Sequence, residues 1–210
     1  MARETKLFRF DELVAGPFES GFAGIDEAGR GPLAGPVVAA AVIFRRRVSL
    51  TGLNDSKKVS PALRETLFKQ ILSHALVGIA AVSERVIDEI NILQATRLAM
   101  REAVLSLPCT PSLLLIDGPI RLDLPLKQMS IIGGDGRSAR IAAASIVAKV
   151  WRDHQMRHWD SVYPGYGFAA HKGYATPGHL KVLEKKGSSD IHRKSFSPVR
   201  VLENWDAEDE

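Results

Sequence analysis

Short apolar runs alternate along the chain with segments in which apolar residues recur every three or four positions. The apolar runs end at Gly, Pro, Asn or Asp, which is typical of buried β-strands. They predict strands over residues 21–26, 36–44, 76–82, 112–117 and 128–132. Because the second run follows the first after a short glycine-rich turn, we expect these two strands to form a hairpin.

Helical spacing is found in four other segments. Ser60-Pro61 is typical of a helix start, with a serine N-cap and a proline at the first helical position. Residues 84–107 predict one or two helices, and residues 137–159 predict one long helix. A Thr-Pro pair begins a last helix, which ends at Gly187.

The order of these elements predicts an α/β fold. Strands dominate the first third of the chain and then alternate with helices, which favours a mixed β-sheet flanked by helices. Residues 164–178 are rich in Pro and Gly and therefore predict a boundary. We divide the chain into a core over residues 1–163, a small helical C-terminal region over residues 164–204 and an acidic tail over residues 205–210.

The net charge of +4 is unevenly distributed. Residues 203–210 hold five acidic residues and no Lys or Arg, so the rest of the chain has 28 basic and 19 acidic residues, a net charge of +9. A basic body suits a polyanionic partner, because Lys and Arg contacts release counterions from a phosphate backbone.

The sequence disfavours a secreted protein and a membrane-spanning protein. The single cysteine, Cys109, excludes a disulfide within the chain, which fits a reducing compartment. The first residues lack the apolar region of a signal peptide, and no apolar run approaches the length of a membrane span. We therefore expect a cytoplasmic protein without a membrane partner.

Four acidic residues lie where predicted elements end. Asp26 and Glu27 close the first strand, Asp117 closes the fourth, and Asp135 lies between the fifth strand and the long helix. Sites in α/β sheets assemble at strand ends. Four carboxylates brought together would repel one another unless cations neutralise them, and Mg²⁺ or Mn²⁺ prefers such oxygen ligands. The pattern therefore predicts a site for one or two divalent cations.

Each acidic position also has a purely structural explanation. Asp135 precedes a helix, where a lone Asp is commonly a turn residue or an N-cap. Asp117 is followed by Gly-Pro, which is typical of a turn. Asp26 and Glu27 are adjacent, and on a regular strand they would point to opposite faces of the sheet. The sequence alone leaves the convergence of the four side chains open.

The turn after the first strand contains Gly29-Arg30-Gly31. Its glycine spacing differs from the dinucleotide-binding fingerprint, and the absence of a following Gly-Lys-Ser/Thr disfavours a P-loop. A purely structural hairpin turn is one interpretation. The other is a phosphate-binding turn, because glycines let backbone N–H groups approach closely and arginine binds phosphate well.

The stretch GIDEAGRGPLAGPV, residues 24–37, resembles the signature of prokaryotic type 2 ribonucleases H, specifically ribonuclease HII. The resemblance covers about residues 20–200, with its motifs in the family's order. They are NDSKK (54–58), the strand ending at Asp117-Gly118, Gly134-Asp135, IAAASIVAKV (141–150), HKGY (171–174) and IHRKSF (191–196).

This resemblance implies an RNase H-like fold whose C-terminal region binds substrate. It further implies an endonuclease that cleaves RNA within RNA–DNA hybrids. The family also incises duplex DNA on the 5′ side of a single embedded ribonucleotide, leaving a 3′-hydroxyl and a 5′-phosphate. We expect two metal ions in the reaction and a monomeric protein.

The resemblance also assigns roles to individual residues. The catalytic, metal-binding carboxylates of the family match Asp26, Glu27, Asp117 and Asp135, which would bind Mg²⁺ or Mn²⁺. Residues 29–31 match the motif that recognises the backbone and the 2′-hydroxyl at the RNA–DNA junction, and Tyr174 matches the tyrosine that packs on the sugar beyond it. The 2′-hydroxyl must be contacted at close range because it distinguishes RNA from DNA.

Further substrate contacts are expected around these residues. Lys57 and Lys149 would bind phosphates and fix the register without reading sequence, with a solvated surface lysine as the alternative. Ser56 and Ser145 belong to the same motifs and are predicted to contact the substrate. The histidines of the C-terminal region would brace loops or contact phosphate rather than bind Mg²⁺, which prefers oxygen: His171, His179 and His192.

The main alternatives are a ribonuclease HIII-like enzyme and a non-catalytic protein that binds RNA–DNA hybrids. Only about twenty residues precede the signature, which disfavours the extra N-terminal domain typical of ribonuclease HIII. The four acidic positions disfavour a passive binder. One position departs from the family pattern, because Gly133 stands where a lysine is usual, and we expect this difference to alter activity modestly.

Overall fold

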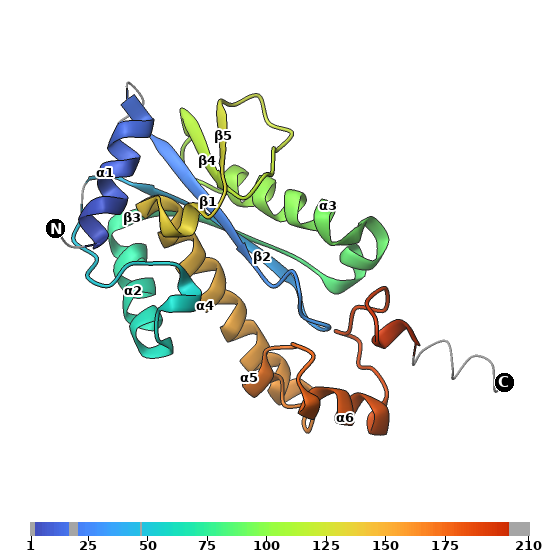
Figure 1. Cartoon of the computed structure of the whole chain (residues 1–210). Helices are drawn as coiled ribbons and strands as arrows, with labels where there is room; N and C mark the ends of the chain where they lie inside the picture. Colours follow the sequence, from blue (N-terminus) through green and yellow to red (C-terminus); the bar gives the residue numbers. More distant parts are fainter. Residues whose placement is uncertain (1–2, 17–20, 47, 202–210) are drawn as a thin grey trace.

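A computed structural model describes residues 3–16, 21–46 and 48–201 around a central five-stranded sheet (Figure 1). The strand order is β3-β2-β1-β4-β5. The strands are β1 (Phe22–Ala28), β2 (Val37–Phe44), β3 (Ala75–Val82), β4 (Leu113–Asp117) and β5 (Gln128–Ile131). Pairing is antiparallel for β1–β2 and β2–β3 but parallel for β1–β4 and β4–β5. The predicted mixed sheet and the antiparallel pairing of its first two strands are confirmed.

Helices cover both faces of the sheet. They are α1 (Arg3–Ala15), α2 (Pro61–His74), α3 (Glu84–Leu105), α4 (Ala139–Val162), α5 (Phe168–His171) and α6 (Pro177–Lys186), together with the 3-10 turns η2 (Ser56–Lys58) and η3 (Gly134–Gly136). The predicted N-cap at Ser60 is confirmed, and α3 is one helix interrupted at Asn91, where φ is 66°. None of the helices in the described part of the chain has the length and hydropathy needed to cross a membrane.

The strand β2 is buried on both faces, which explains why it appears in the sequence as a continuous apolar run. Its alternate residues pack against α2 and α4 on one face and against α3 on the other, as Figure 1 shows for the helices. On β1, a Cβ at Gly24 would lie 2.2 Å from the backbone carbon of Arg140. Glycine at this position therefore lets α4 cross closely over β1, which brings α4 beside the acidic end of that strand.

The helix α1 was not predicted by the sequence pattern. Its Leu7 and Phe8 join the core, and Asp11 accepts hydrogen bonds from the backbone and side chain of Arg140, each at 3.2 Å. The Arg140 guanidinium also lies 3.6 Å from the centroid of the Phe22 ring. The helix is thus held by a buried ion pair across the fold, a tertiary contact that local periodicity does not report.

The segment after α4 folds back onto the connection between β1 and β2, the glycine turn (residues 29–36). Leu33 N–H donates to the Gly173 carbonyl, and Gly35 N–H donates to the Ile191 carbonyl, both at 2.8 Å. The C-terminal region is therefore joined by backbone hydrogen bonds to the turn that follows β1. The boundary at residue 163 stays a prediction, and the predicted acidic tail lies outside the described residues.

Candidate active site

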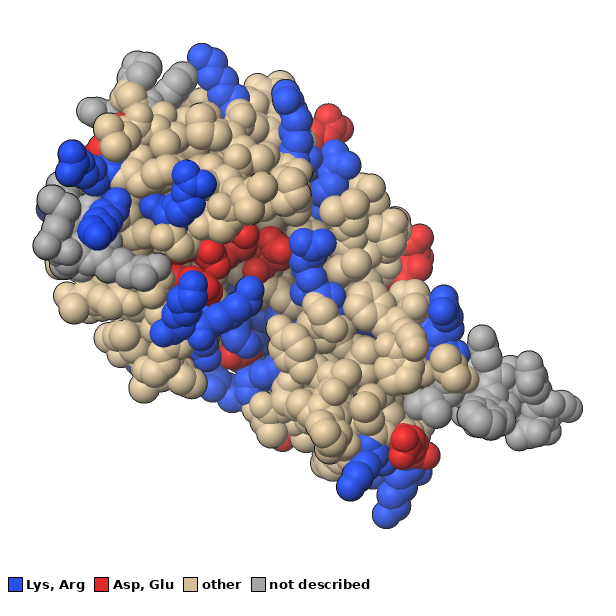
Figure 2. All heavy atoms as spheres, in the orientation of Figure 1, with Lys and Arg blue, Asp and Glu red and all other residues tan. Residues whose placement is uncertain are grey.

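A pocket of about 540 Å³ lies beside the end of β1. The structure brings all of the predicted site residues to its lining: Asp26, Glu27, Gly29, Arg30, Gly31, Ser56, Lys57, Asp117, Asp135, Ser145, Lys149 and Tyr174. Figure 2 shows acidic side chains gathered in a hollow of the surface, with Lys and Arg side chains around it. Ala28, Ile92 and Arg152 also line the pocket and were not predicted.

Parallel pairing of β1 and β4 brings three of the carboxylates together. Asp26 and Glu27 lie near the end of β1, and Asp117 is the last residue of β4. The two strands pair in the register Ile25–Ile116, so Asp26 and Asp117 each follow one member of a matched pair. The carboxyl ends of parallel strands meet at one edge of a sheet, which explains this convergence.

Asp135 reaches the pocket from η3. The Gly134 N–H donates to Asp117 Oδ1 at 2.6 Å and ties η3 to the end of β4. The N-cap of α4 is Ser138, whose Oγ accepts a hydrogen bond from the Ile141 N–H at 3.2 Å. The N-cap interpretation of Asp135 is therefore wrong, and the turn in which Asp135 lies directs it to the pocket.

Asp26 and Glu27 both line the pocket although adjacent strand residues alternate between faces. Asp26 is on the α4 face, where it is buried and hydrogen-bonded to Ser145 of α4. Glu27 follows it at the strand end, and its Oε1 accepts a hydrogen bond from Arg30 Nη1 at 3.4 Å. Both side chains contribute because the pocket lies at the end of the sheet rather than on one face.

The acidic cluster consists of Asp26, Glu27, Asp117 and Asp135, and burial and repulsion raise the pKa values of Asp26, Glu27 and Asp135. Burial raises the pKa of Asp26 well above its usual range, and the charges of Glu27 and Asp117 raise it further. Burial also raises the pKa of Glu27, although the nearby Arg30 opposes this shift. The pKa of Asp135 is raised by burial first and then by Asp55 and Asp117. Ionisation of these groups is therefore costly without nearby positive charge.

The acidic cluster fits hard divalent cations such as Mg²⁺ or Mn²⁺, which prefer carboxylate oxygens and would offset the repulsion. Within residues 3–16, 21–46 and 48–201, no three His, Cys, Asp or Glu side chains are already placed to hold a metal ion. Instead, the Asp26 and Asp117 carboxylates accept backbone N–H groups at 2.7 and 2.6 Å. The donor chemistry therefore suits the cations, and the side chains must adjust to enclose them.

Basic and hydroxyl side chains lie on the side of the pocket formed by η2 and α4. The hydroxyl groups of Ser145 on α4 and Ser56 on η2 are hydrogen-bonded to each other at 3.0 Å, which fixes η2 against α4. Lys57 of η2 and Lys149 of α4 line the pocket, and Lys149 Nζ contacts Asp153 Oδ1 at 2.6 Å. These contacts hold two lysines next to the acidic cluster.

The glycines of the glycine turn have different local roles. Gly29 has φ +97°, and a Cβ there would lie 2.1 Å from Arg152 Nε, so the turn conformation and the buried arginine both require glycine. By contrast, a Cβ at Gly31 would meet only the Tyr174 ring, at 3.9 Å. Gly31 therefore leaves open space beside Tyr174, and packing within the described part of the protein does not require glycine at this position.

The three histidines of the C-terminal region brace loops, one of the two predicted roles. His171 accepts a hydrogen bond from the Gly173 N–H, and His179 Nδ1 contacts the Tyr174 carbonyl at 2.9 Å. The Nε2 atoms of His179 and His192 lie 3.0 Å apart, and His192 is bonded in turn to Ser189. This series of hydrogen bonds ends at the Tyr174 carbonyl and supports the backbone of that residue.

Arg152 is the most informative lining residue that sequence reasoning missed. It lies seven residues after Ser145 on α4, in register with the fully buried Ala148 and Met156. An arginine on the apolar side of a long helix is unusual, because a buried cation needs partners. The position of Arg152 on the apolar side of α4 was the signal in the sequence that could have identified it. The three backbone carbonyls that Arg152 contacts explain how an arginine is accommodated there.

Comparison with known proteins agrees with this geometry. The Ribonuclease HII family model matches residues 23–199. A ribonuclease HII of Enterococcus faecalis is 51% identical over 205 residues, which cover 95% of this chain and 80% of that protein. The ribonuclease H2 of Pyrococcus horikoshii OT3 is a solved structure with a TM-score of 0.73 and 26% identity, covering 88% of this chain and 97% of that one. The RNase HII of Archaeoglobus fulgidus, solved in complex with PCNA, also has a TM-score of 0.73, with 28% identity over 84% of this chain and 95% of that one.

These findings confirm the RNase H-like fold and decide between the alternatives left by the sequence. The match to the Ribonuclease HII family model, with 51% identity to a ribonuclease HII, favours that family over a ribonuclease HIII-like enzyme. The passive hybrid-binding protein is set aside because the family consists of metal-dependent nucleases. Its members generally use divalent metal ions, in agreement with the chemistry of the acidic cluster. From residue 23 to residue 199, the chain belongs to the ribonuclease HII family.

Proposed function

We propose that this protein cleaves the RNA strand of RNA–DNA hybrids and incises duplex DNA on the 5′ side of a single embedded ribonucleotide. The products would carry 3′-hydroxyl and 5′-phosphate ends. The observation that carries the proposal is that the acidic cluster and residues 29–31 of the glycine turn line the same pocket. Groups suited to phosphodiester hydrolysis therefore lie directly beside groups suited to contact with a nucleic-acid backbone.

The acidic cluster would hold two divalent cations, Mg²⁺ or Mn²⁺. When bound, two such cations help to activate the attacking water and to stabilise the departing 3′-oxygen of a phosphodiester. The protein holds the ligands in place, because Ser145 and the Glu27 N–H bond to Asp26 while the Gly134 N–H bonds to Asp117. No covalent intermediate with the protein is required.

The glycine turn would select the phosphodiester that is presented to the acidic cluster. Arg30 is exposed at the pocket and can contact a phosphate while its guanidinium stays near Glu27. Gly31 leaves space for a ribose beside the half-exposed Tyr174 ring. A 2′-hydroxyl in this space can be tested by backbone N–H groups and by packing on the aromatic ring.

Lys57 and Lys149 would bind phosphates of the substrate, with Ser56 and Ser145 beside them. A phosphate would compete with Asp153 for Lys149, because the two side chains already form an ion pair at 2.6 Å. Such contacts fix the position of the duplex without reading its sequence. The contacts require no second subunit, and we propose a monomer that acts in the cytoplasm.

The decisive experiment is cleavage of a DNA duplex with one ribonucleotide, with Mg²⁺, with Mn²⁺ and with EDTA. We expect a single incision 5′ to the ribonucleotide with either metal and none with EDTA. All-DNA and all-RNA duplexes should remain intact. Asp117→Asn is the matched variant, expected to fold and bind the duplex without turnover, and near wild-type cleavage by this variant would contradict the proposal.

A further inference from the structure

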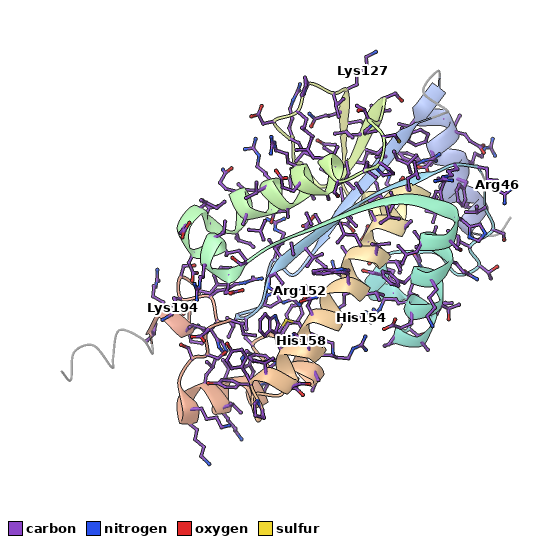
Figure 3. All side chains as sticks on the ribbon, turned by 180° about the vertical axis from the view of Figure 1, so that it is seen from behind. Arg46, Lys127, Arg152, His154, His158 and Lys194 are labelled. Atoms are coloured by element: carbon purple, nitrogen blue, oxygen red, sulfur yellow. The ribbon has the colours of Figure 1, made fainter. Side chains whose placement is uncertain are left out.

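Two buried arginines lie directly beneath the glycine turn. Arg193, in the loop after α6, is fully buried and donates to the turn carbonyls of Gly29 (2.6 Å), Arg30 (2.9 Å) and Gly35 (2.8 and 3.0 Å). Arg152 lies on α4 beside the connection between β1 and β2 (Figure 3). It donates, at 2.9 to 3.0 Å, to the carbonyls of Ala34, Pro36 and Lys172.

These hydrogen bonds fix the direction of the turn amides. A peptide unit is planar and trans, so each N–H points away from the preceding carbonyl. The carbonyls of Gly29 and Arg30 face Arg193 in the interior, and the N–H groups of Arg30 and Gly31 therefore face the exposed side. Neither N–H donates to a backbone carbonyl in the described part of the chain. The turn thus presents two adjacent donors to the pocket.

Both arginines are held by carbonyls rather than carboxylates. Neither guanidinium forms a salt bridge within the residues that the structure describes. Burial, with the neighbouring Arg152, lowers the pKa of Arg193 to about 9, and burial lowers that of Arg152 to about 10, so both stay charged at neutral pH. A guanidinium suits this role because it offers five N–H donors in one plane, whereas an ammonium offers three.

We infer that Arg193, supported by Arg152, is a positioning residue that presets the Arg30 and Gly31 amides for the backbone and the 2′-hydroxyl at an RNA–DNA junction. The inference rests on the proposed function of the pocket. It gives a role to the arginine of the motif at residues 191–196, which family resemblance alone left without one. Arg193 does not line the pocket and acts through the turn that it holds.

The test is Arg193→Lys, which keeps the charge but removes the planar fork. We expect kcat/KM on a duplex with one ribonucleotide to fall about 10- to 100-fold, because displacement of a positioning group by about 1 Å has effects of this size. Cleavage of a long RNA–DNA hybrid should fall less, since a continuous RNA strand offers many usable registers. The Mg²⁺ concentration for half-maximal activity should not change, because the acidic cluster is intact.

Two further variants separate positioning from general stability. Arg140→Lys is the matched control, because Arg140 is also buried but pairs with Asp11 on α1. It should lower the melting temperature without changing the ratio of kcat/KM between the two substrates. Gly31→Ala obstructs the same contact directly, so combining it with Arg193→Lys should reduce kcat/KM no further than the larger single effect.

The outcomes are distinguishable from failure of the proposed function. Absence of cleavage by the wild type at a single ribonucleotide would refute the proposed function. If the wild type cleaves and folded Arg193→Lys keeps its kcat/KM ratio within about twofold, or if the double variant is additive, Arg193 is not a positioning residue. Should Arg193→Lys fail to fold, Arg152→Lys tests the supporting part of the inference, because Arg152 holds the same turn through the Ala34 and Pro36 carbonyls. An unchanged ratio in that variant overturns the inference.

Discussion

The acidic cluster gathers several negative side chains, and the glycine turn lies over two positive ones, but the surroundings of these buried charges differ. In the cluster, burial and mutual repulsion raise the pKa values of Asp26, Glu27 and Asp135. Beneath the turn, Arg152 and Arg193 together donate seven hydrogen bonds to backbone carbonyls. The charges under the turn are satisfied by the protein, whereas those of the cluster repel one another, which suits the divalent cations that the family generally uses.

This difference suits the two tasks that we propose for neighbouring parts of the pocket. Repulsion among carboxylates favours the binding of divalent cations, which relieve it. Recognition of one hydroxyl group requires donors that are already in position, because reorganisation on binding weakens discrimination. Since β1 ends at Ala28 and the turn begins at Gly29, the two arrangements meet within a single short stretch of chain.

The largest expected effect is that Asp26→Asn changes activity and stability in opposite directions. Activity should fall at least about 10³-fold, because several kcal/mol of transition-state stabilisation depends on the cations held by the cluster. The raised folded-state pKa of Asp26 means that its ionisation reduces stability above its ordinary pKa of 3.8. At pH 7 in EDTA, the variant should therefore melt at a higher temperature than the wild type, by about 2 to 4 °C for each 1 kcal/mol gained.

Thermal melts with and without Mg²⁺, together with cleavage rates, measure both parts of this prediction. Mg²⁺ should raise the melting temperature of the wild type more than that of Asp26→Asn. A variant that melts lower than the wild type in EDTA would show that the cluster is not under electrostatic strain.

The next comparison uses two glycines of the glycine turn. Gly29→Ala should destabilise by about 3 kcal/mol or more, because φ is +97° and the new Cβ meets Arg152. Gly31→Ala should leave the melting temperature nearly unchanged but reduce kcat/KM on the single-ribonucleotide duplex about 10-fold. Denaturant unfolding and steady-state kinetics on both variants test this split. Equal loss of stability in the two variants would mean that Gly31 is also structural.

A smaller, pH-dependent effect is expected at the histidines that support Tyr174. Burial, and then the neighbouring His171, lowers the pKa of His179 below its ordinary value of 6.5. As the pH falls, the unfolded chain therefore takes up a proton at a higher pH than the folded protein does. The stability contributed by neutral His179 is fully present above pH 6.5 and is lost as the pH falls below that value. Each proton taken up on unfolding corresponds to at most about 1.4 kcal/mol per pH unit.

His179→Asn is the matched variant for this effect, because asparagine retains a donor for the Tyr174 carbonyl but does not titrate. Denaturant unfolding at pH 7.5 and pH 5.5 should show a larger loss of stability for the wild type than for the variant. Parallel losses would place the sensitivity to acid elsewhere in the molecule.

Much of the fold was accessible from the sequence because its signals are local. The five apolar runs became strands, and the serine before Pro61 became an N-cap, since burial and capping act over a few residues. The helix α1 was missed because its attachment depends on the Asp11–Arg140 pair, whose members are 129 residues apart. Local patterns report which segments can form an element but not a distant contact that fixes it.

The candidate site follows the same division. The carboxylates stood at strand ends and in motifs with a family resemblance, so the sequence predicted the lining of the pocket. Periodicity did not predict the support beneath the glycine turn, because Arg152 and Arg193 approach it from α4 and from the C-terminal loop. The spacing of the glycines also did not distinguish the roles of Gly29 and Gly31. A side chain at Gly29 would collide with Arg152, whereas Gly31 lies beside open space.

The smallest expected effect concerns Gly133, where the family usually has lysine. Gly133 is exposed and adopts the left-handed conformation, with φ +62°, which costs other residues about 1 kcal/mol. Gly133→Lys should therefore melt slightly lower. Its added charge near Asp135 should raise the Mg²⁺ concentration for half-maximal activity about two- to fivefold without abolishing cleavage.

Gly133→Gln controls for backbone strain and side-chain length, so a change in Mg²⁺ dependence confined to the lysine variant isolates the charge. Identical kinetics for all three proteins across Mg²⁺ concentrations would show that the acidic cluster is insensitive to added charge at residue 133. The cluster would then differ from the glycine turn, which we expect to depend on the charged arginines beneath it.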